Sequence, residues 1–226
     1  MNEIIINGKK AVLGPEEPFD PRNPEHLDST KYMVKHGTVD IHVKQVMSFV
    51  GKDPDLVWAA LFHDLGKPPT HTEENGHHHF YSHETVGTEM AKIIMERLKF
   101  SNEATERILF LVENHMWVHN VKGMRNATIR RMIGQEHFAD LRTLGIADCL
   151  GSDGKLDEIH FLDGKIEEFS HLPVRPTPLI TGRDLIDLGL KPGPKFKDIL
   201  DTMLDKQLEQ VFTTREHGLE ILKEII

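Results

Sequence analysis

The sequence predicts an all-α protein, a bundle of helices with a short β-hairpin at the N-terminus and a small helical tail at the C-terminus. From about Thr38 onward, apolar residues recur at the 3.6-residue spacing of amphipathic helices. Residues that typically begin or end helices flank these segments. Asp53 is a good N-cap, Pro54 suits the first position of a helix, and Pro68-Pro69 stand where the same helix should have ended near Gly66.

Strand and loop signals come before Thr38. Glu3–Leu13 has the pattern of a β-hairpin, because Asn7-Gly8 supplies the two residues with positive φ that a type I′ turn requires. The four prolines between residues 14 and 30 indicate an extended lead-in to the helices.

The helices are expected to follow one another through short connections. Their predicted bounds are about 38–51, 53–66, 82–99, 102–115, 126–134, 136–150, 181–188, 194–210 and 213–225. Ser82 is the expected N-cap of the third of them. Residues 151–178 are richer in glycine, proline and turn pairs, so we expect them to be irregular, with a helical turn or two within 155–169.

Length and proline positions predict the domain organisation. A chain of 226 residues can bury one good-sized core, with a small appendage. Prolines at positions 173, 176 and 178 mark a boundary after the main domain. We therefore expect a hairpin and lead-in over 1–30, the main domain over 31–170, and the helical tail over 171–226.

Composition narrows the class of protein. The formal net charge of −9 disfavours a surface that coats nucleic acid non-specifically, although a local basic pocket is compatible with it. The only cysteine, Cys149, cannot form an intramolecular disulfide, which fits a reducing compartment. No stretch approaches the roughly 20 apolar residues that cross a bilayer, and residues 1–10 do not resemble a signal peptide. The expectation is a cytoplasmic protein without a membrane partner.

Two histidines and two aspartates fall on apolar helix faces. The four residues are His42, His63, Asp64 and Asp148. Each follows apolar residues at the spacing of a helix face, which points all four toward the core from three helices. A buried aspartate costs several kcal/mol unless it is paired or bound to a cation. The pattern therefore predicts a divalent metal site. Nitrogen and oxygen ligands together suit manganese, iron, nickel or zinc, and magnesium also fits.

Alternatives exist for each residue taken alone. A single histidine on an apolar face is more often a hydrogen-bonded core residue than a ligand. An adjacent His-Asp pair is common by chance, and an arginine or a backbone amide can satisfy Asp148. It is the combination of four such residues on separate helices that favours a metal.

Three further residues extend the predicted site. His115 lies on an apolar face, and His83 lies in the first turn after Ser82. They can complete a second metal position, with Asp64 bridging the two, or bind a phosphate oxygen directly. The site is thus expected to hold one or two ions. Lys67 follows the His-Asp pair by one turn, where it either complements the helix dipole or neutralises a substrate phosphate.

The pattern His42, His63-Asp64-Leu65-Gly66-Lys67 and Asp148 resembles the HD superfamily of metal-dependent phosphohydrolases, so the bundle is expected to be an HD-domain bundle. His79-Phe80-Tyr81-Ser82-His83-Glu84 and Glu113-Asn114-His115 match accessory stretches of many members, which commonly have glycine where this chain has Ser82. By this resemblance His42, His63, Asp64 and Asp148 are metal ligands. His83 and His115 are then second-metal or phosphate ligands.

Within the superfamily, the chain resembles the HD domain and the C-terminal tail of some bacterial CCA-adding enzymes, the tRNA nucleotidyltransferases, without their nucleotidyltransferase head. The similarity lies in Thr38–His42, Trp58–Lys67, Leu179–Ile186 and Leu190–Phe196. It implies hydrolysis of 2′,3′-cyclic phosphates, 2′-nucleotides or terminal phosphates, with a nucleotide or an RNA end as substrate and tRNA as a candidate partner. Nucleotide addition is not implied. Gly151-Ser152 is present, but the pair of acids that this chemistry needs is not, and the Gly-Tyr-Pro signature of cyclic-dinucleotide phosphodiesterases is also missing.

The expected reaction is hydrolysis of a phosphate ester by water activated at the metal. Lys67 and the accessory histidines would stabilise charge on the phosphoryl oxygens, and His83 or Glu84 would deliver a proton to the leaving oxygen. One alternative is a 5′-nucleotidase or dNTP hydrolase. Another is a tRNA- or RNA-binding module with a silent or structural metal site. A plain helical domain without metal is the third.

In the RNA-binding alternative, three basic residues would contact the RNA. They are Arg125, Arg130 and Arg131. The ordinary interpretation of such arginines is a solvated helix face. Metal identity and oligomeric state stay open at this level.

Overall fold

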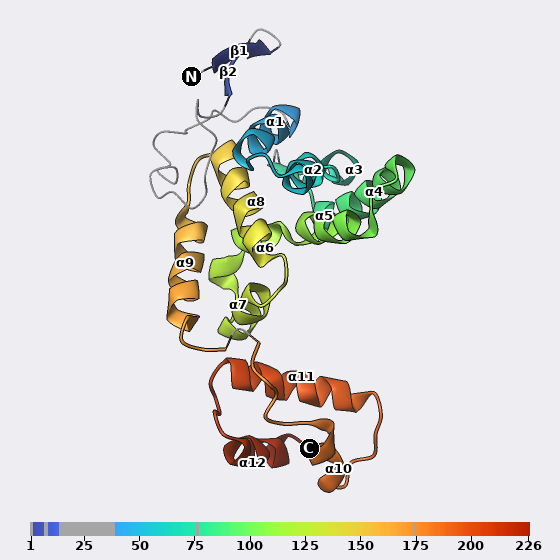
Figure 1. Cartoon of the computed structure of the whole chain (residues 1–226), viewed down its shortest axis with the longest axis vertical. Helices are drawn as coiled ribbons and strands as arrows, with labels where there is room; N and C mark the ends of the chain where they lie inside the picture. Colours follow the sequence, from blue (N-terminus) through green and yellow to red (C-terminus); the bar gives the residue numbers. More distant parts are fainter. Residues whose placement is uncertain (1, 7–8, 14–38, 76, 174) are drawn as a thin grey trace. The chain divides into compact units, whose positions relative to one another are not determined.

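The computed structural model describes residues 2–6, 9–13, 39–75, 77–173 and 175–226, and its helices confirm the all-α class (Figure 1). The chain divides into two compact units. The first unit contains Met1–Lys122 and Glu136–Asp163, and the second contains Gly123–Gln135 and Gly164–Ile226. The domain boundaries that we expected after residues 30 and 170 stay a prediction.

The first unit is a bundle of helices joined by short turns. Its helices are α1 Val39–Phe49, α2 Pro54–Phe62, α3 Lys67–Thr70, α4 His83–Leu98, α5 Asn102–Asn114, α6 Met116–His119 and α8 Phe138–Gly151, and α9 Asp157–Phe169 begins in it. The predicted start of α2 is confirmed, because the Asp53 carboxylate accepts from the backbone N–H groups of Asp55 and Leu56 while Pro54 occupies the first helical position.

Helix α8 is the central element of this bundle. It packs against α1, α2, α5 and α6, and every residue from Leu144 to Gly151 is buried. Two glycines permit the close packing, because a Cβ on Gly145 would meet Val118 at 2.8 Å and one on Gly151 would meet Val46 at 2.8 Å. Asp148 therefore lies in a helix that is covered on all sides, where a carboxylate needs positive partners.

The second unit has its own core. Its helices are α7 Asn126–Ile133, α10 Gly182–Asp187, α11 Lys195–Leu208 and α12 Arg215–Ile225, and α11 contacts each of the other three (Figure 1). The buried apolar side chains of the core are Ile180, Leu185, Met203, Phe212 and Leu222. Asp184 stabilises the start of α10, because its carboxylate accepts from the backbone N–H and the hydroxyl of Thr181 and pairs with Arg215.

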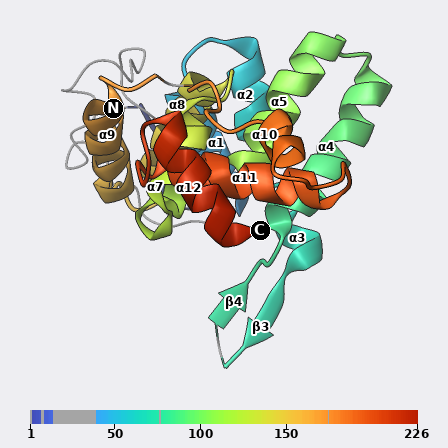
Figure 2. The ribbon, with the colours of Figure 1, turned by 90° about the horizontal axis from the view of Figure 1, so that it is seen from below.

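The expected helices are present, but the structure differs from the sequence prediction at four places. Helix α2 ends at Phe62 rather than near residue 66, and the two prolines that follow lie in the first turn of α3, where proline is tolerated. Strands β3 Thr72–Glu74 and β4 His77–His79 form an unexpected antiparallel pair that leads away from α3 (Figure 2). The short helix α6 was not expected either.

The fourth difference is α9, a regular helix of 13 residues where we expected a helical turn or two. Leu156, Ile159 and Leu162 are buried at helical spacing, and this apolar stripe outweighs the glycine and turn residues around it.

At the N-terminus, strands β1 Asn2–Ile6 and β2 Lys9–Leu13 pair antiparallel, in agreement with the predicted hairpin. The predicted Asn7-Gly8 turn and the proline-rich lead-in lie outside the described residues. No helix within the described ranges combines the length and the apolar character that crossing a bilayer requires.

Candidate metal centre

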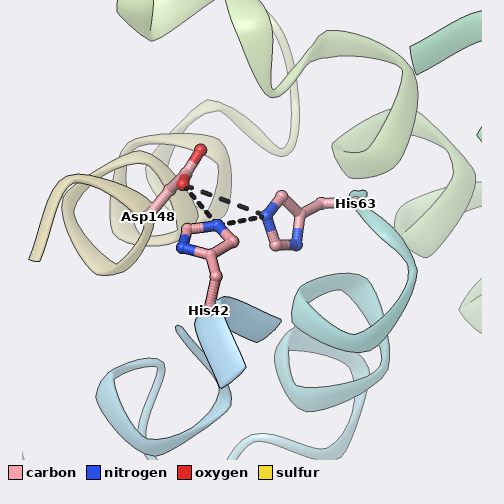
Figure 3. A group of neighbouring side chains, drawn as sticks. All are labelled: His42, His63 and Asp148. Atoms are coloured by element: carbon pink, nitrogen blue, oxygen red, sulfur yellow. Dashed lines mark hydrogen bonds and ion pairs between the residues drawn. The ribbon is translucent and has the colours of Figure 1, made fainter. Parts of the chain in front are cut away.

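The structure brings together all six residues that the sequence suggested as metal or phosphate ligands. They form two groups of three, and within each group the ligand atoms all lie within 4.8 Å of one another. The first group is His42, His63 and Asp148 (Figure 3), and the second group is Asp64, His83 and His115.

Figure 3 shows how the first group is assembled from separate segments. His42 comes from α1, Asp148 from α8, and His63 from the turn that follows α2. His42 Nε2 lies 3.1 Å from His63 Nε2 and 3.1 Å from Asp148 Oδ1, and His63 Nε2 lies 3.9 Å from the same oxygen. Two nitrogens and one oxygen thus face a common point in the interior of the bundle.

The second group lies next to the first, and Asp64 connects the two. Its Oδ1 is 3.6 Å from His83 Nε2, which is 3.1 Å from His115 Nε2. Its Oδ2 is 3.5 Å from the Nε2 atoms of both His42 and His63. The two oxygens of one carboxylate therefore face different groups, the arrangement that a bridging carboxylate between two ions requires.

Hydrogen bonds to the main chain orient all four imidazoles in the same way. The four Nδ1 atoms lie at hydrogen-bonding distance from the carbonyl oxygens of Gly151 (His42, 3.2 Å), Ala60 (His63, 2.7 Å), Phe80 (His83, 2.9 Å) and Val112 (His115, 2.7 Å). A carbonyl oxygen only accepts, so each Nδ1 carries the proton, and in the neutral ring Nε2 keeps its lone pair. Histidine ligands to metals are usually fixed by this kind of bond.

With this tautomer, the short contacts between histidines favour a cation site. In each group two Nε2 atoms face each other at 3.1 Å, and when both rings are neutral two lone pairs cannot form a hydrogen bond. A divalent cation bound by these nitrogens would remove that repulsion. The donor set of imidazole nitrogens and carboxylate oxygens fits a divalent first-row ion or magnesium, without selecting among them.

The protonation states of Asp148, Asp64 and His115 also suit metal ligands. Burial alone would raise the pKa of Asp148, but hydrogen bonds from the neighbouring imidazoles hold that pKa well below its usual range. Burial likewise opposes ionisation of Asp64, and the neighbouring His63 and the ammonium group of Lys67 lower its pKa nevertheless. Burial and the nearby His63 lower the pKa of His115 to about 3, so that ring is neutral at physiological pH. The carboxylates are thus ionised where a cation would bind.

A close backbone approach places the two groups side by side. A Cβ on Gly66 would collide with the His83 carbonyl oxygen and lie 2.7 Å from the Gly87 nitrogen. The turn that carries His63 and Asp64 therefore packs main chain to main chain against the start of α4. Gly66 is needed because no side chain fits between these segments.

Ser82 precedes His83 in a left-handed conformation, with φ of 61° and ψ of 23°. The expectation that Ser82 caps α4 was wrong, because its side chain makes no capping hydrogen bond. The backbone requires this conformation in order to turn His83 inward. Glycine adopts this conformation at no steric cost.

We therefore expect Ser82→Gly to raise the free energy of unfolding by about 0.5 kcal/mol, because relief of the left-handed strain outweighs the added entropy of the unfolded chain. Ser82→Val should lower that free energy by about 1–2 kcal/mol, since a β-branched residue fits this region poorly. Urea denaturation measures both. An equal effect of the two substitutions would show that the backbone does not hold this conformation in solution.

His119 also belongs to the site, and the sequence argument missed it. Its Nε2 lies 2.7 Å from Asp148 Oδ2, the oxygen that the first group leaves unused. His119 is at the end of α6, four residues after His115. That spacing, which places two side chains on one face of a helix, was the available signal. The contact fixes the Asp148 carboxylate from its outer side.

Replacing His119 with glutamine should weaken metal binding by about 10–100-fold, the usual effect of losing a partner that orients a ligand. Titration of the apoprotein with Mn²⁺ measures the change, and circular dichroism checks the fold. His160→Gln is the matched control, because His160 is exposed on α9. Equal metal affinity in both variants would exclude a positioning role for His119.

The two remaining predicted catalytic residues lie at the edge of the second group. Lys67 Nζ donates to Asp64 Oδ2 at 2.7 Å and lies 5.7 Å from the centre of the Phe80 ring. Glu84 Oε2 is 3.4 Å from His83 Nδ1. The side chains of Lys67 and Glu84 are 26% and 30% exposed, so each can reach a ligand that enters from solvent. Their roles in a reaction stay predictions.

The three predicted RNA-contacting arginines lie on or next to α7, in the second unit. Arg125 and Arg131 both pair with Asp205, and Arg130 is buried. They are therefore not part of the metal centre. Contact with RNA stays a prediction for all three.

Comparisons with known proteins agree with the geometry. The family model described as the HD domain matches residues 39–150. That range includes His42 and Asp148, the first and last of the six ligand residues, and it also includes His119.

Two of the similar curated proteins are named as tRNA nucleotidyltransferases. The chain is 35% identical over 169 residues to the CC-adding tRNA nucleotidyltransferase of Thermus thermophilus, an overlap that covers 73% of this chain and 38% of that protein. It is 29% identical over 208 residues to the A-adding tRNA nucleotidyltransferase of Deinococcus radiodurans, covering 84% and 45%. A multifunctional CCA protein of Actinobacillus pleuropneumoniae is 31% identical over 159 residues, covering 65% and 38%. The chain thus spans less than half the length of these relatives.

Proposed function

Because residues 39–150 of the chain are an HD domain, of the metal-dependent phosphohydrolase family, we propose that the protein hydrolyses phosphate esters of nucleotides or RNA ends. The proposed activity is that of a 2′,3′-cyclic phosphodiesterase, 2′-nucleotidase or phosphatase. The position of Asp64, with one carboxylate oxygen facing each group of ligands, carries this proposal. The relatives are named for adding nucleotides to tRNA, which supports a substrate with a nucleotide or RNA end.

The ligands proposed for the cation or cations are the two groups already described. A divalent cation bound there would supply positive charge that lowers the pKa of a nearby water and polarises the phosphoryl group. The burial of Asp64 and Asp148 serves this chemistry, because charges act over a given distance more strongly where water is excluded.

The residues at the edge of the site would act on the substrate itself. We propose that Lys67 neutralises charge on the phosphoryl oxygens, since its ammonium group is partly exposed and fixed beside Asp64. His83 has its Nε2 directed at Asp64 and His115, so Glu84 is the better placed of the two candidates to deliver a proton to the leaving oxygen.

An assay of the purified chain tests the proposal. Bis-p-nitrophenyl phosphate and 2′,3′-cAMP are offered with Mn²⁺, Ni²⁺ and Mg²⁺, followed by a panel of 2′-, 3′- and 5′-nucleotides and dNTPs. We expect metal-dependent turnover that EDTA abolishes, with the cyclic and 2′ substrates preferred. A preference for 5′-nucleotides or dNTPs would overturn the proposed substrate class, and bound metal without any turnover would overturn the proposed activity.

A further inference from the structure

The second unit contains a surface cavity of about 240 Å³ that the metal centre does not use. Three arginines line it, Arg130 and Arg131 from α7 and Arg175 from the segment before α10. Leu204 and Leu208 of α11 and the ring of Pro176 supply apolar walls. We call this cavity the arginine pocket, and every residue that lines it belongs to the second unit.

Main-chain hydrogen bonds hold the guanidinium groups at this pocket. Arg130 is only 5% exposed, and it donates to the carbonyl oxygens of Leu208 at 2.7 Å and Pro173 at 3.3 Å. Arg175 donates to the carbonyl oxygen of Gly134. Carbonyl oxygens orient a guanidinium without neutralising its charge, so the positive charges stay available to a ligand.

Positive charge exceeds negative charge around the pocket. Within the part of the chain that the structure describes, neither Arg130 nor Arg175 pairs with a carboxylate. Arg131 pairs with Asp205, but that carboxylate also pairs with Arg125. Glu209 acts on Arg130 through its charge, but its carboxylate accepts from the backbone N–H of Ala127 and forms no salt bridge with Arg130. Burial of a cation without a salt-bridge partner is costly, and an anion that enters the pocket would offset that cost.

We propose that the arginine pocket binds the phosphate group of a nucleotide. Guanidinium groups match phosphate oxygens in charge and in bidentate geometry. The leucine and proline walls suit a sugar or base ring attached to that phosphate, as apolar walls with a few polar groups do in ligand sites generally. The nucleotide is either free or part of an RNA strand, because both present the same phosphate chemistry.

NMR titration of the full chain tests this proposal. The protein is labelled with ¹⁵N and kept in EDTA, so that no ligand can bind through a metal, and the arginine Nε–H signals are followed as CMP or a single-stranded RNA octamer is added. Arg175→Ala is the main variant, because Arg175 is exposed and its loss should not disturb the core. Arg183→Ala is the matched control, since Arg183 is an equally removable charge of α10 that does not line the pocket.

We expect saturable shifts of the Arg130 and Arg131 signals, and at least a tenfold weaker affinity in Arg175→Ala, with little change in Arg183→Ala. RNA that binds more than tenfold tighter than CMP would assign the site to an RNA strand, and comparable affinities would assign it to free nucleotides. An equal loss of affinity in the two variants would show that binding depends only on overall charge, and it would overturn the proposed site. Absence of saturable shifts with both ligands would overturn it as well.

Discussion

Replacing Asp64 with alanine should reduce metal-dependent phosphatase turnover by roughly 10³-fold, a loss of about 4 kcal/mol of transition-state stabilisation. The Asp64 carboxylate faces both ligand groups, with Oδ2 at 3.5 Å from His42 and His63 and Oδ1 at 3.6 Å from His83. Its loss therefore weakens both groups at once. Removal of a carboxylate that contacted only one group would reduce turnover by a smaller factor.

The matched control for this variant is Asp187→Ala, which removes the same charge from an exposed position on α10. Turnover of bis-p-nitrophenyl phosphate and metal content are measured for both proteins, with circular dichroism to confirm that each is folded. The control should behave like the parent. Turnover of Asp64→Ala at the parental rate would contradict the mechanism.

The substitution Gly66→Ala should lower the free energy of unfolding by about 3 kcal/mol. The added methyl group would collide with the main chain of His83 and Gly87, and main chain cannot move aside as a flexible side chain can. In the variant molecules that remain folded, the turn after α2 must lie farther from the start of α4. Because Asp64 lies in that turn and His83 begins α4, the distance between these two members of the second group should grow and turnover should fall.

A second glycine provides a control, because its replacement should change the free energy of unfolding in the opposite direction. Gly164 lies within α9, and a Cβ there would meet nothing within 4 Å. Gly164→Ala should therefore raise the free energy of unfolding by about 0.5–1 kcal/mol, the usual gain in a helix interior. Thermal and urea denaturation compare the two variants. If both alanines stabilised the protein, the close approach at Gly66 would not exist.

The sequence singled out the six candidate ligands because the chemistry of most of them conflicts with their position. Two aspartates and several histidines at positions expected to face the core have few explanations other than a cation, and the structure places all six together. Helix periodicity indicated that these side chains are buried, although it extended α2 by four residues. His63 and Asp64 in fact lie in the turn after that helix.

Other features depended on tertiary contacts that no local pattern encodes. The partner of His119 is 29 residues away in the sequence, and the main-chain acceptors of Arg130 are 78 and 43 residues away. The strain at Ser82 arises because the backbone must turn His83 inward, whereas serine before a helix ordinarily indicates a cap. Local propensity therefore located the start of α4 but gave the wrong reason for it.

A crystal structure of the protein grown with excess Mn²⁺, with anomalous data collected above the manganese edge, tests the central claim most directly. We expect at least one anomalous peak among the Nε2 atoms of His42 and His63 and the carboxylates of Asp64 and Asp148, at about 2.0–2.3 Å from its ligands. A fully ordered site with these side chains in place and no anomalous density among them would contradict the account.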